Sequence, residues 1–131
     1  MPTLYVLNAA ALSKPGAVDH LAVDLKSVGA SVAVITETHF KQKHADSVIG
    51  IDGYTLFRRD RHGRRGGGVA IYVQTNIQAS IWQSSSSDSR VFELLWVRVG
   101  SSLFVAALYH PPPTGTQLPI YSAMLRIVSL N

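Results

Sequence analysis

Two apolar segments on either side of one amphipathic helix constrain the fold of this chain most strongly. Residues 4–7 read Leu-Tyr-Val-Leu and end on Asn8, and residues 31–36 read Ser-Val-Ala-Val-Ile-Thr and end on Glu37. Short apolar runs of this kind are typical of buried strands, and a helix between two strands favours a right-handed crossover with the strands parallel. Asn8 and Glu37 are therefore expected side by side at the carboxyl edge of a sheet, where open α/β folds bind ligands.

An amide and a carboxylate at that edge predict a metal site. Their oxygen atoms suit a hard cation such as Mg²⁺, with Mn²⁺ as a substitute, and the phosphate that the cation carries. Taken by position alone, Glu37 fits an ordinary solvated acid at a strand end equally well. Asn8 alone is also a common residue of turns and caps.

The rest of the chain indicates a single α/β domain, residues 1–131, with a mixed sheet. The helix is expected to start with Ser13 as its cap and Pro15 in the first turn, and to stop at Gly29. Further strands are expected at residues 54–58, 69–73, 77–82, 91–99 and 103–109, the last two forming a hairpin around Gly100. Apolar residues at helical spacing predict a second helix within residues 119–130.

Composition narrows the class of protein. The chain has 131 residues, 47% of them hydrophobic, which suits one folded domain and argues against disorder. It has no cysteine, so disulfides and thiolate zinc sites are excluded. No apolar stretch approaches the roughly 20 residues of a membrane helix, and no basic segment precedes the first apolar run. We therefore expect an intracellular protein with no membrane partner. Its net charge of +4 favours anionic binding partners.

A basic loop and a glycine run lie in the middle of the chain. Residues 66–68 are three glycines without the lysine and Ser/Thr of a P-loop, so we expect them to let the backbone bend into a strand. The arginines before them suit contacts with DNA phosphates, and they also fit a solvated turn or a nuclear-localisation patch. They are Arg58, Arg59, Arg61, Arg64 and Arg65.

Four segments, in this order and at these distances, resemble those of a known family. They are Leu7-Asn8, Ile35-Thr36-Glu37-Thr38, Arg65-Gly66-Gly67-Gly68-Val69-Ala70-Ile71-Tyr72, and Leu108-Tyr109-His110-Pro111-Pro112. Together they resemble the amino-terminal part of the apurinic-like endonuclease domain of non-LTR retrotransposons, which precedes a reverse transcriptase. That domain belongs to the endonuclease/exonuclease/phosphatase superfamily.

The resemblance implies a four-layer α/β sandwich and Mg²⁺-dependent hydrolysis of a DNA phosphodiester, with water as the nucleophile. It implies that Glu37 binds the metal, that Asn8 helps to position metal and phosphate, and that Tyr109 contacts the phosphate. The arginine loop would then grip the DNA backbone, and a nucleus is a plausible location.

The departures from the family limit this expectation. The family continues with an Asp-x-Asn segment that orients the attacking water and the scissile phosphate, and it ends with Ser-Asp-His. Neither segment occurs in this sequence. We therefore expect a truncated domain whose carboxy-terminal half is missing and whose own activity is weak or lost. A missing half or a reverse-transcriptase region would be its partner, and the alternatives are a non-catalytic nucleic-acid-binding relic or a phosphatase of the same superfamily.

Overall fold

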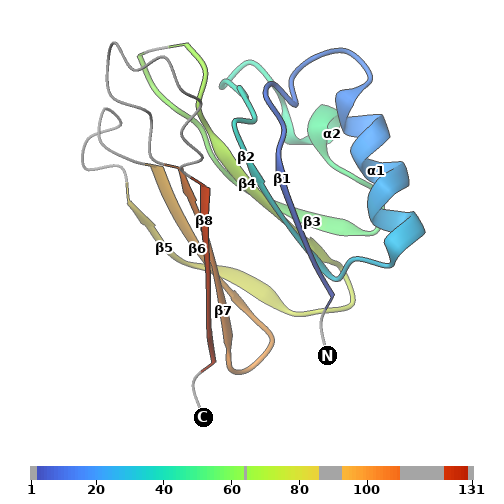
Figure 1. The fold of residues 1–131 in the computed structure, drawn as a ribbon, viewed down its shortest axis with the longest axis vertical. Helices are drawn as coiled ribbons and strands as arrows, with labels where there is room; N and C mark the ends of the chain where they lie inside the picture. Colours follow the sequence, from blue (N-terminus) through green and yellow to red (C-terminus); the bar gives the residue numbers. More distant parts are fainter. Residues whose placement is uncertain (1–2, 64, 86–92, 110–122, 130–131) are drawn as a thin grey trace.

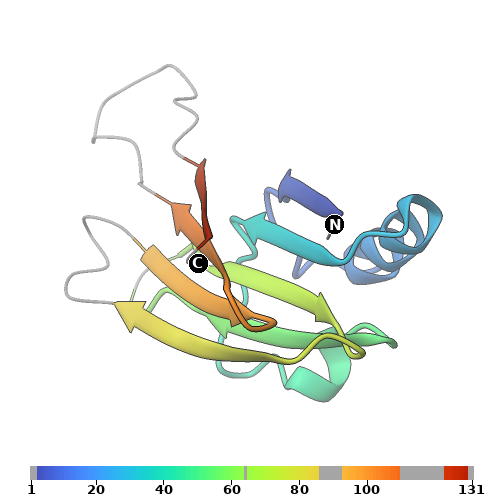
Figure 2. The same cartoon turned by 90° about the horizontal axis from the view of Figure 1, so that it is seen from below.

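The fold consists of two four-stranded sheets with helices on the outer side of one of them (Figures 1 and 2). The computed structural model describes residues 3–63, 65–85, 93–109 and 123–129. The first sheet, called sheet A, contains β1 (Leu4–Asn8), β2 (Val32–Thr36), β4 (Val69–Gln74) and β3 (Tyr54–Arg59) in that spatial order. The helices are α1 (Ala17–Val28) and α2 (Asp46–Ile49).

Sheet A is mixed, as the sequence predicts. β1 and β2 run parallel with Asn8 opposite Thr36, whereas β2 and β3 both pair antiparallel with β4. The parallel pair is connected through α1, so the expected strand-helix-strand unit is present. Its carboxyl edge carries Asn8 and, directly after β2, Glu37.

The second sheet, called sheet B, is antiparallel throughout. It contains β5 (Ala79–Ser85), β6 (Glu93–Val99), β7 (Leu103–Tyr109) and β8 (Ala123–Ser129) in sequence order. β6 and β7 form the expected hairpin around Gly100, which has a φ of 65°. The helix expected within residues 119–130 is wrong for residues 123–129, which pair along the whole of β7. The free edge of β7 offers a row of backbone partners, and that tertiary pairing outweighs a local helical spacing.

Two hydrophobic cores lie on the two faces of sheet A. Alternate residues of β2 and β4 point to opposite faces, as strand geometry requires. Val34 and Ile71 pack with sheet B, whereas Ile35 and Tyr72 pack with the helices. The described residues therefore form three layers, namely helices, sheet A and sheet B. The expected fourth layer does not occur among them, and the full four-layer sandwich stays a proposal.

The first helix begins later than the sequence predicts. Its cap is Gly16, with a φ of 80°, instead of Ser13, and Pro15 precedes the helix. Gly29 ends it as expected, with a φ of 65° and its N–H bonded to the carbonyl oxygens of the last turn. Leu21 and Leu25 are buried against sheet A, so the helix covers the face behind β1 and β2. Among the described residues, no helix is long and apolar enough to cross a membrane.

One buried hydrogen bond joins the centre of sheet A to α2. The Tyr72 hydroxyl donates to the Ile49 carbonyl oxygen at 2.8 Å, and Tyr72 is fully buried. We expect Tyr72→Phe to lower the free energy of unfolding by about 1–2 kcal/mol, because the Ile49 carbonyl oxygen is left without its partner. Urea denaturation measures this loss. Tyr5→Phe, which removes a solvent-exposed 3.4 Å bond to Asp24 of α1, is the control and is expected to cost less.

Candidate active site

Glu37 occupies a sharp backbone turn at the carboxyl end of β2. Its φ is 54°, in the left-handed region that residues with a side chain seldom adopt. Hydrogen bonds on both sides hold this conformation. The Ala11 N–H donates to the Glu37 carbonyl oxygen at 2.8 Å, and the Thr38 N–H donates to the Gly68 carbonyl oxygen at 3.2 Å. A non-glycine residue kept in this conformation by its surroundings is a feature that clusters at functional sites.

Tyr109 meets Glu37 across the two sheets. The phenol donates a 2.6 Å hydrogen bond to Glu37 Oε1, although the residues are 72 positions apart and lie on different sheets. Burial, followed by the hydrogen bond and the charge of Glu37, raises the pKa of Tyr109 to about 12. Tyr109 is therefore a protonated donor near neutral pH. The structure thus brings together two of the three residues that the sequence resemblance assigns to the site.

Asn8 lies at the same sheet edge, but its side chain is bonded to the backbone two residues further along. Its Oδ1 accepts a 3.2 Å hydrogen bond from the Ala10 N–H, and its side chain is exposed. The pairing of Asn8 with Thr36 makes it a neighbour of Glu37 in the sheet.

The oxygen donors at this edge fit a magnesium ion. Mg²⁺ is commonly held by one or two carboxylates, several waters and the substrate phosphate, so it needs few protein ligands. Glu37 Oε2 has no hydrogen-bond partner among the described residues, and the Asn8 amide oxygen is the other candidate ligand. No cluster of three or more His, Cys, Asp or Glu side chains occurs in the described part of the chain, so a closed all-protein metal cage is not formed there.

Positive charge gathers beside Glu37. Burial lowers the pKa of His39, two positions after Glu37. The charge of Glu37 opposes that change, whereas Lys41, Arg61 and Lys14 add to it. Lys41 and Lys14 thus add positive charge near Glu37, which suits an anionic substrate, whereas the charge of Arg61 is paired with Glu93.

Arg58 is engaged within the protein. Its guanidinium donates to both oxygens of Asp60, at 3.1 and 2.6 Å, and to Asp46 at 2.8 Å. It also donates to the carbonyl oxygens of Lys41 and His44. Its side chain is 16% exposed. These contacts tie residues 41–46 to the end of β3, and they do not support the expected contact of Arg58 with DNA.

The other four arginines lie in different settings. Arg61 is largely buried, with its side chain 9% exposed, and pairs with Glu93, with 2.8 Å between Nε and Oε2. Arg59 is partly buried at the end of β3, Arg65 is exposed, and Arg64 lies outside the described residues. Arg65 is thus the arginine of this group whose described position best suits contact with a nucleic-acid backbone.

Sequence reasoning missed Glu93, which is the buried acid nearest to this site. It is 2% exposed and opens β6, directly opposite Tyr109 on β7. The signal was present in the sequence. Glu93 precedes Leu95, Val97 and Val99 at alternate positions, so strand periodicity places a carboxylate on the inward face, where it requires a partner.

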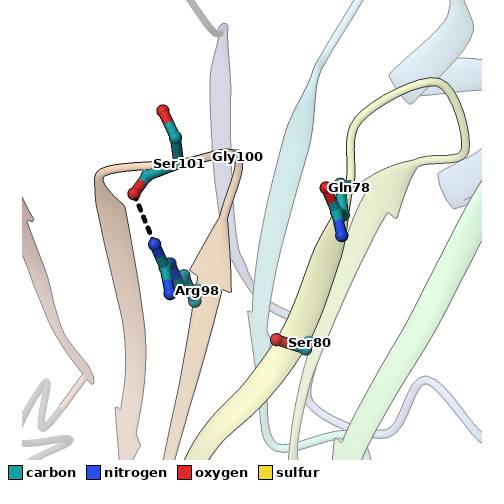
Figure 3. A pocket seen from close by; sticks show the side chains of 5 residues that line it. All are labelled: Gln78, Ser80, Arg98, Gly100 and Ser101. Carbon is teal, nitrogen blue, oxygen red and sulfur yellow. Dashed lines mark hydrogen bonds between the residues drawn. The ribbon is translucent and has the colours of Figure 1, made fainter.

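A polar pocket of about 340 Å³ lies at the opposite end of the β6–β7 hairpin (Figure 3). It is lined by Gln78, Ser80, Arg98, Gly100 and Ser101. Its charged member, Arg98, donates to the Ser101 carbonyl oxygen at 2.7 Å. Neither an acid nor a histidine is among the described residues that line it.

Comparison with known proteins supports the fold. Neither a protein-family model nor a curated protein sequence matches the chain. Among solved structures, the chain is similar to the AP endonuclease LMAP from Leishmania major, with a TM-score of 0.52 and 17% sequence identity. The match covers 85% of this chain and 36% of that one, so the chain spans about a third of its length. The chain therefore has a mixed α/β fold like that of an AP endonuclease, as the resemblance to the endonuclease/exonuclease/phosphatase superfamily implies.

Proposed function

We propose that this chain is the amino-terminal part of a Mg²⁺-dependent DNA endonuclease of the retrotransposon type. The observation that carries the proposal is the 2.6 Å hydrogen bond between Tyr109 and Glu37. It joins a candidate metal ligand to a candidate hydrogen-bond donor for phosphate. The two meet at the carboxyl edge of a sheet, where such folds bind ligands. The AP endonuclease-like fold and the cationic side chains around Glu37 agree with it.

Each site residue has a distinct role in this proposal. Glu37 offers its second carboxylate oxygen to Mg²⁺ while Tyr109 holds the first, so the carboxylate is oriented before the ion arrives. The Tyr109 phenol has a single O–H, so it would donate to a phosphate oxygen only after releasing Glu37 Oε1. Asn8 contributes a neutral amide, which orients an anionic substrate without repelling it. The bound Mg²⁺ would neutralise phosphate oxygens and stabilise the charge that develops on them.

In this proposal a four-layer sandwich is completed by sequence outside this chain, which would supply the Asp-x-Asn and Ser-Asp-His segments. Such a missing half, or a reverse-transcriptase region, is the proposed partner, and DNA is the proposed substrate. Arg65, together with Arg59 and Arg64, is the proposed contact with the DNA backbone.

The test is nicking of supercoiled plasmid with Mg²⁺ or Mn²⁺ by the chain, alone and fused to a carboxy-terminal half of an AP endonuclease that carries the two missing segments. We expect weak or no nicking by the chain alone and nicking by the fusion. Glu37→Gln in the fusion is expected to lower the rate by about 100-fold or more, as loss of a group that stabilises transition-state charge does. Asp52→Asn, the same acid-to-amide change on an exposed turn, is the matched control and should leave the rate unchanged.

A folded fusion that nicks equally well with Glu37→Gln would exclude Glu37 as the metal ligand. A second candidate function is nucleic-acid binding without cleavage, which the exposed position of Arg65 in the basic loop favours. In that case DNA binding would weaken steeply with salt and would respond neither to Mg²⁺ nor to Glu37→Gln.

A further inference from the structure

Glu93 connects two parts of the protein that meet at the candidate site. Its Oε1 accepts a 2.7 Å hydrogen bond from the Gly68 N–H, and its Oε2 accepts one of 2.8 Å from Arg61 Nε. Gly68 directly precedes β4 of sheet A, whereas Glu93 opens β6 of sheet B. One buried carboxylate therefore joins both sheets at the edge where Glu37 and Tyr109 meet.

Arg61 is held in one orientation between this carboxylate and Tyr109. Its guanidinium lies 5.8 Å from the centre of the Tyr109 ring, within the range of a cation–π contact. Its Nη1 donates to the Arg65 carbonyl oxygen at 3.0 Å, and its side chain is 9% exposed. A Cβ atom on Gly67 would collide with the guanidinium, so the backbone there approaches Arg61 as closely as glycine allows.

The same glycines hold the segment that follows Glu37. The carbonyl oxygens of Gly68 and Gly67 accept hydrogen bonds from the N–H groups of Thr38 and His39, at 3.2 and 2.8 Å. Glu93 thus fixes Gly68, whose carbonyl oxygen bonds the residue next to Glu37. It also fixes Arg61, whose guanidinium faces Tyr109, and so it acts on both ends of the Glu37–Tyr109 hydrogen bond.

We propose that Glu93 and Arg61 are positioning residues of the proposed phosphodiesterase site, which set the geometry of Glu37 and Tyr109 without touching the substrate. This inference rests on the proposed function for its role in catalysis. A buried ion pair is by itself weak evidence for stability, since desolvation offsets much of its attraction. What distinguishes this pair is where its hydrogen bonds lead, namely to the backbone beside Glu37 and to the ring of Tyr109.

The first test measures amide hydrogen exchange in the metal-free chain, so it does not depend on activity. Glu93→Gln keeps the size of the side chain but replaces one acceptor oxygen with an NH₂ group. We expect the Thr38 and His39 amides to exchange about tenfold faster, which corresponds to loss of a hydrogen bond to a charged group. Amides at the centres of β2 and β4, Val34 and Ile71, should change by less than about twofold.

Asp60→Asn is the matched control. It weakens the neighbouring ion pair with Arg58, at 2.6 Å, which has no contact with Tyr109 among those that the structure describes. We expect it to leave exchange at Thr38 and His39 unchanged. Unchanged exchange there in Glu93→Gln, or equal acceleration at Val34 and Ile71, would overturn the positioning role.

A second variant decides the question if Glu93→Gln does not fold. Arg61→Lys keeps a cation for Glu93 but lacks the planar group that covers Tyr109 and bonds the Arg65 carbonyl oxygen. It should accelerate exchange at His39 with the strand centres unchanged, and unaltered exchange at His39 would overturn the proposal.

The affinity for Mn²⁺, measured by water proton relaxation, separates this inference from the proposed function. We expect Glu93→Gln to weaken Mn²⁺ binding about tenfold or more, as loss of a group that orients a metal ligand does. If the unaltered chain does not bind Mn²⁺, the metal site of the proposed function fails, while the exchange data still decide whether Glu93 positions Glu37.

Discussion

Gly68→Ala is expected to lower the free energy of unfolding by about 2–5 kcal/mol, which combines the strain of a left-handed residue with overpacking. The φ of Gly68 is 87°, and a Cβ atom there would collide with the buried Thr38 hydroxyl oxygen. Relief would require Thr38 to move, and Thr38 follows Glu37 directly. Urea denaturation followed by circular dichroism measures the loss.

Gly63→Ala is the matched control for this prediction. Gly63 lies in the same loop with a φ of 76°, but its Cβ atom would meet no other atom within 4 Å. It carries the conformational strain without the collision, so its expected cost is about 1–2 kcal/mol. Equal losses for the two variants would show that the Thr38 side chain moves aside at no cost. The close approach at Gly68 would then contribute nothing to the change in the free energy of unfolding.

Arg58→Ala is expected to lower the free energy of unfolding by about 3–5 kcal/mol, since it removes one partner of a largely buried ion pair. The Asp60 carboxylate, whose side chain is 13% exposed, would lose its cation. The carbonyl oxygens of Lys41 and His44 would lose a donor at the same time. Thermal and urea denaturation measure the effect, and electrophoretic mobility shift at several salt concentrations measures DNA binding.

Arg65→Ala is the opposite case in the same basic loop. Arg65 is exposed, so its loss is expected to change the free energy of unfolding by less than about 0.5 kcal/mol. If it contacts DNA, its loss should weaken binding and reduce the slope of binding against salt by about one. The reverse pattern, a stable Arg58→Ala variant that binds DNA poorly, would restore Arg58 to the nucleic-acid interface and contradict the structural role.

The parts of the fold set by local chemistry are predictable from the sequence. The strand-helix-strand unit, the hairpin around Gly100 and the stop at Gly29 follow from runs of apolar residues and from glycines with positive φ. The contact between Glu37 and Tyr109 cannot be predicted from local chemistry, because Glu37 follows β2 of sheet A whereas Tyr109 lies on β7 of sheet B. That pairing was accessible through resemblance to a family and not through spacing.

The remaining features depend on contacts between distant segments. The role of Arg61 cannot be read from its basic neighbours, because its partner, Glu93, lies 32 positions away. The strand at residues 123–129 depends on the free edge of β7 and not on its own apolar spacing. Trp82 is a large aromatic residue of the kind usually found in a core, yet it is 56% exposed. It lies at a register shift between Ile81 and Gln83 in β5.

The 72-residue separation between Glu37 and Tyr109 also orders events during synthesis of the chain. β1, α1 and β2 leave the ribosome early, and Glu37 leaves with them, but Tyr109 follows only after both strands of the hairpin have been made. Contacts this distant in sequence form late, since a long loop must close first. A nascent chain therefore carries its candidate metal ligand without the phenol that orients it. In this protein, the contact between Glu37 and Tyr109 forms only once both strands of the β6–β7 hairpin have been made.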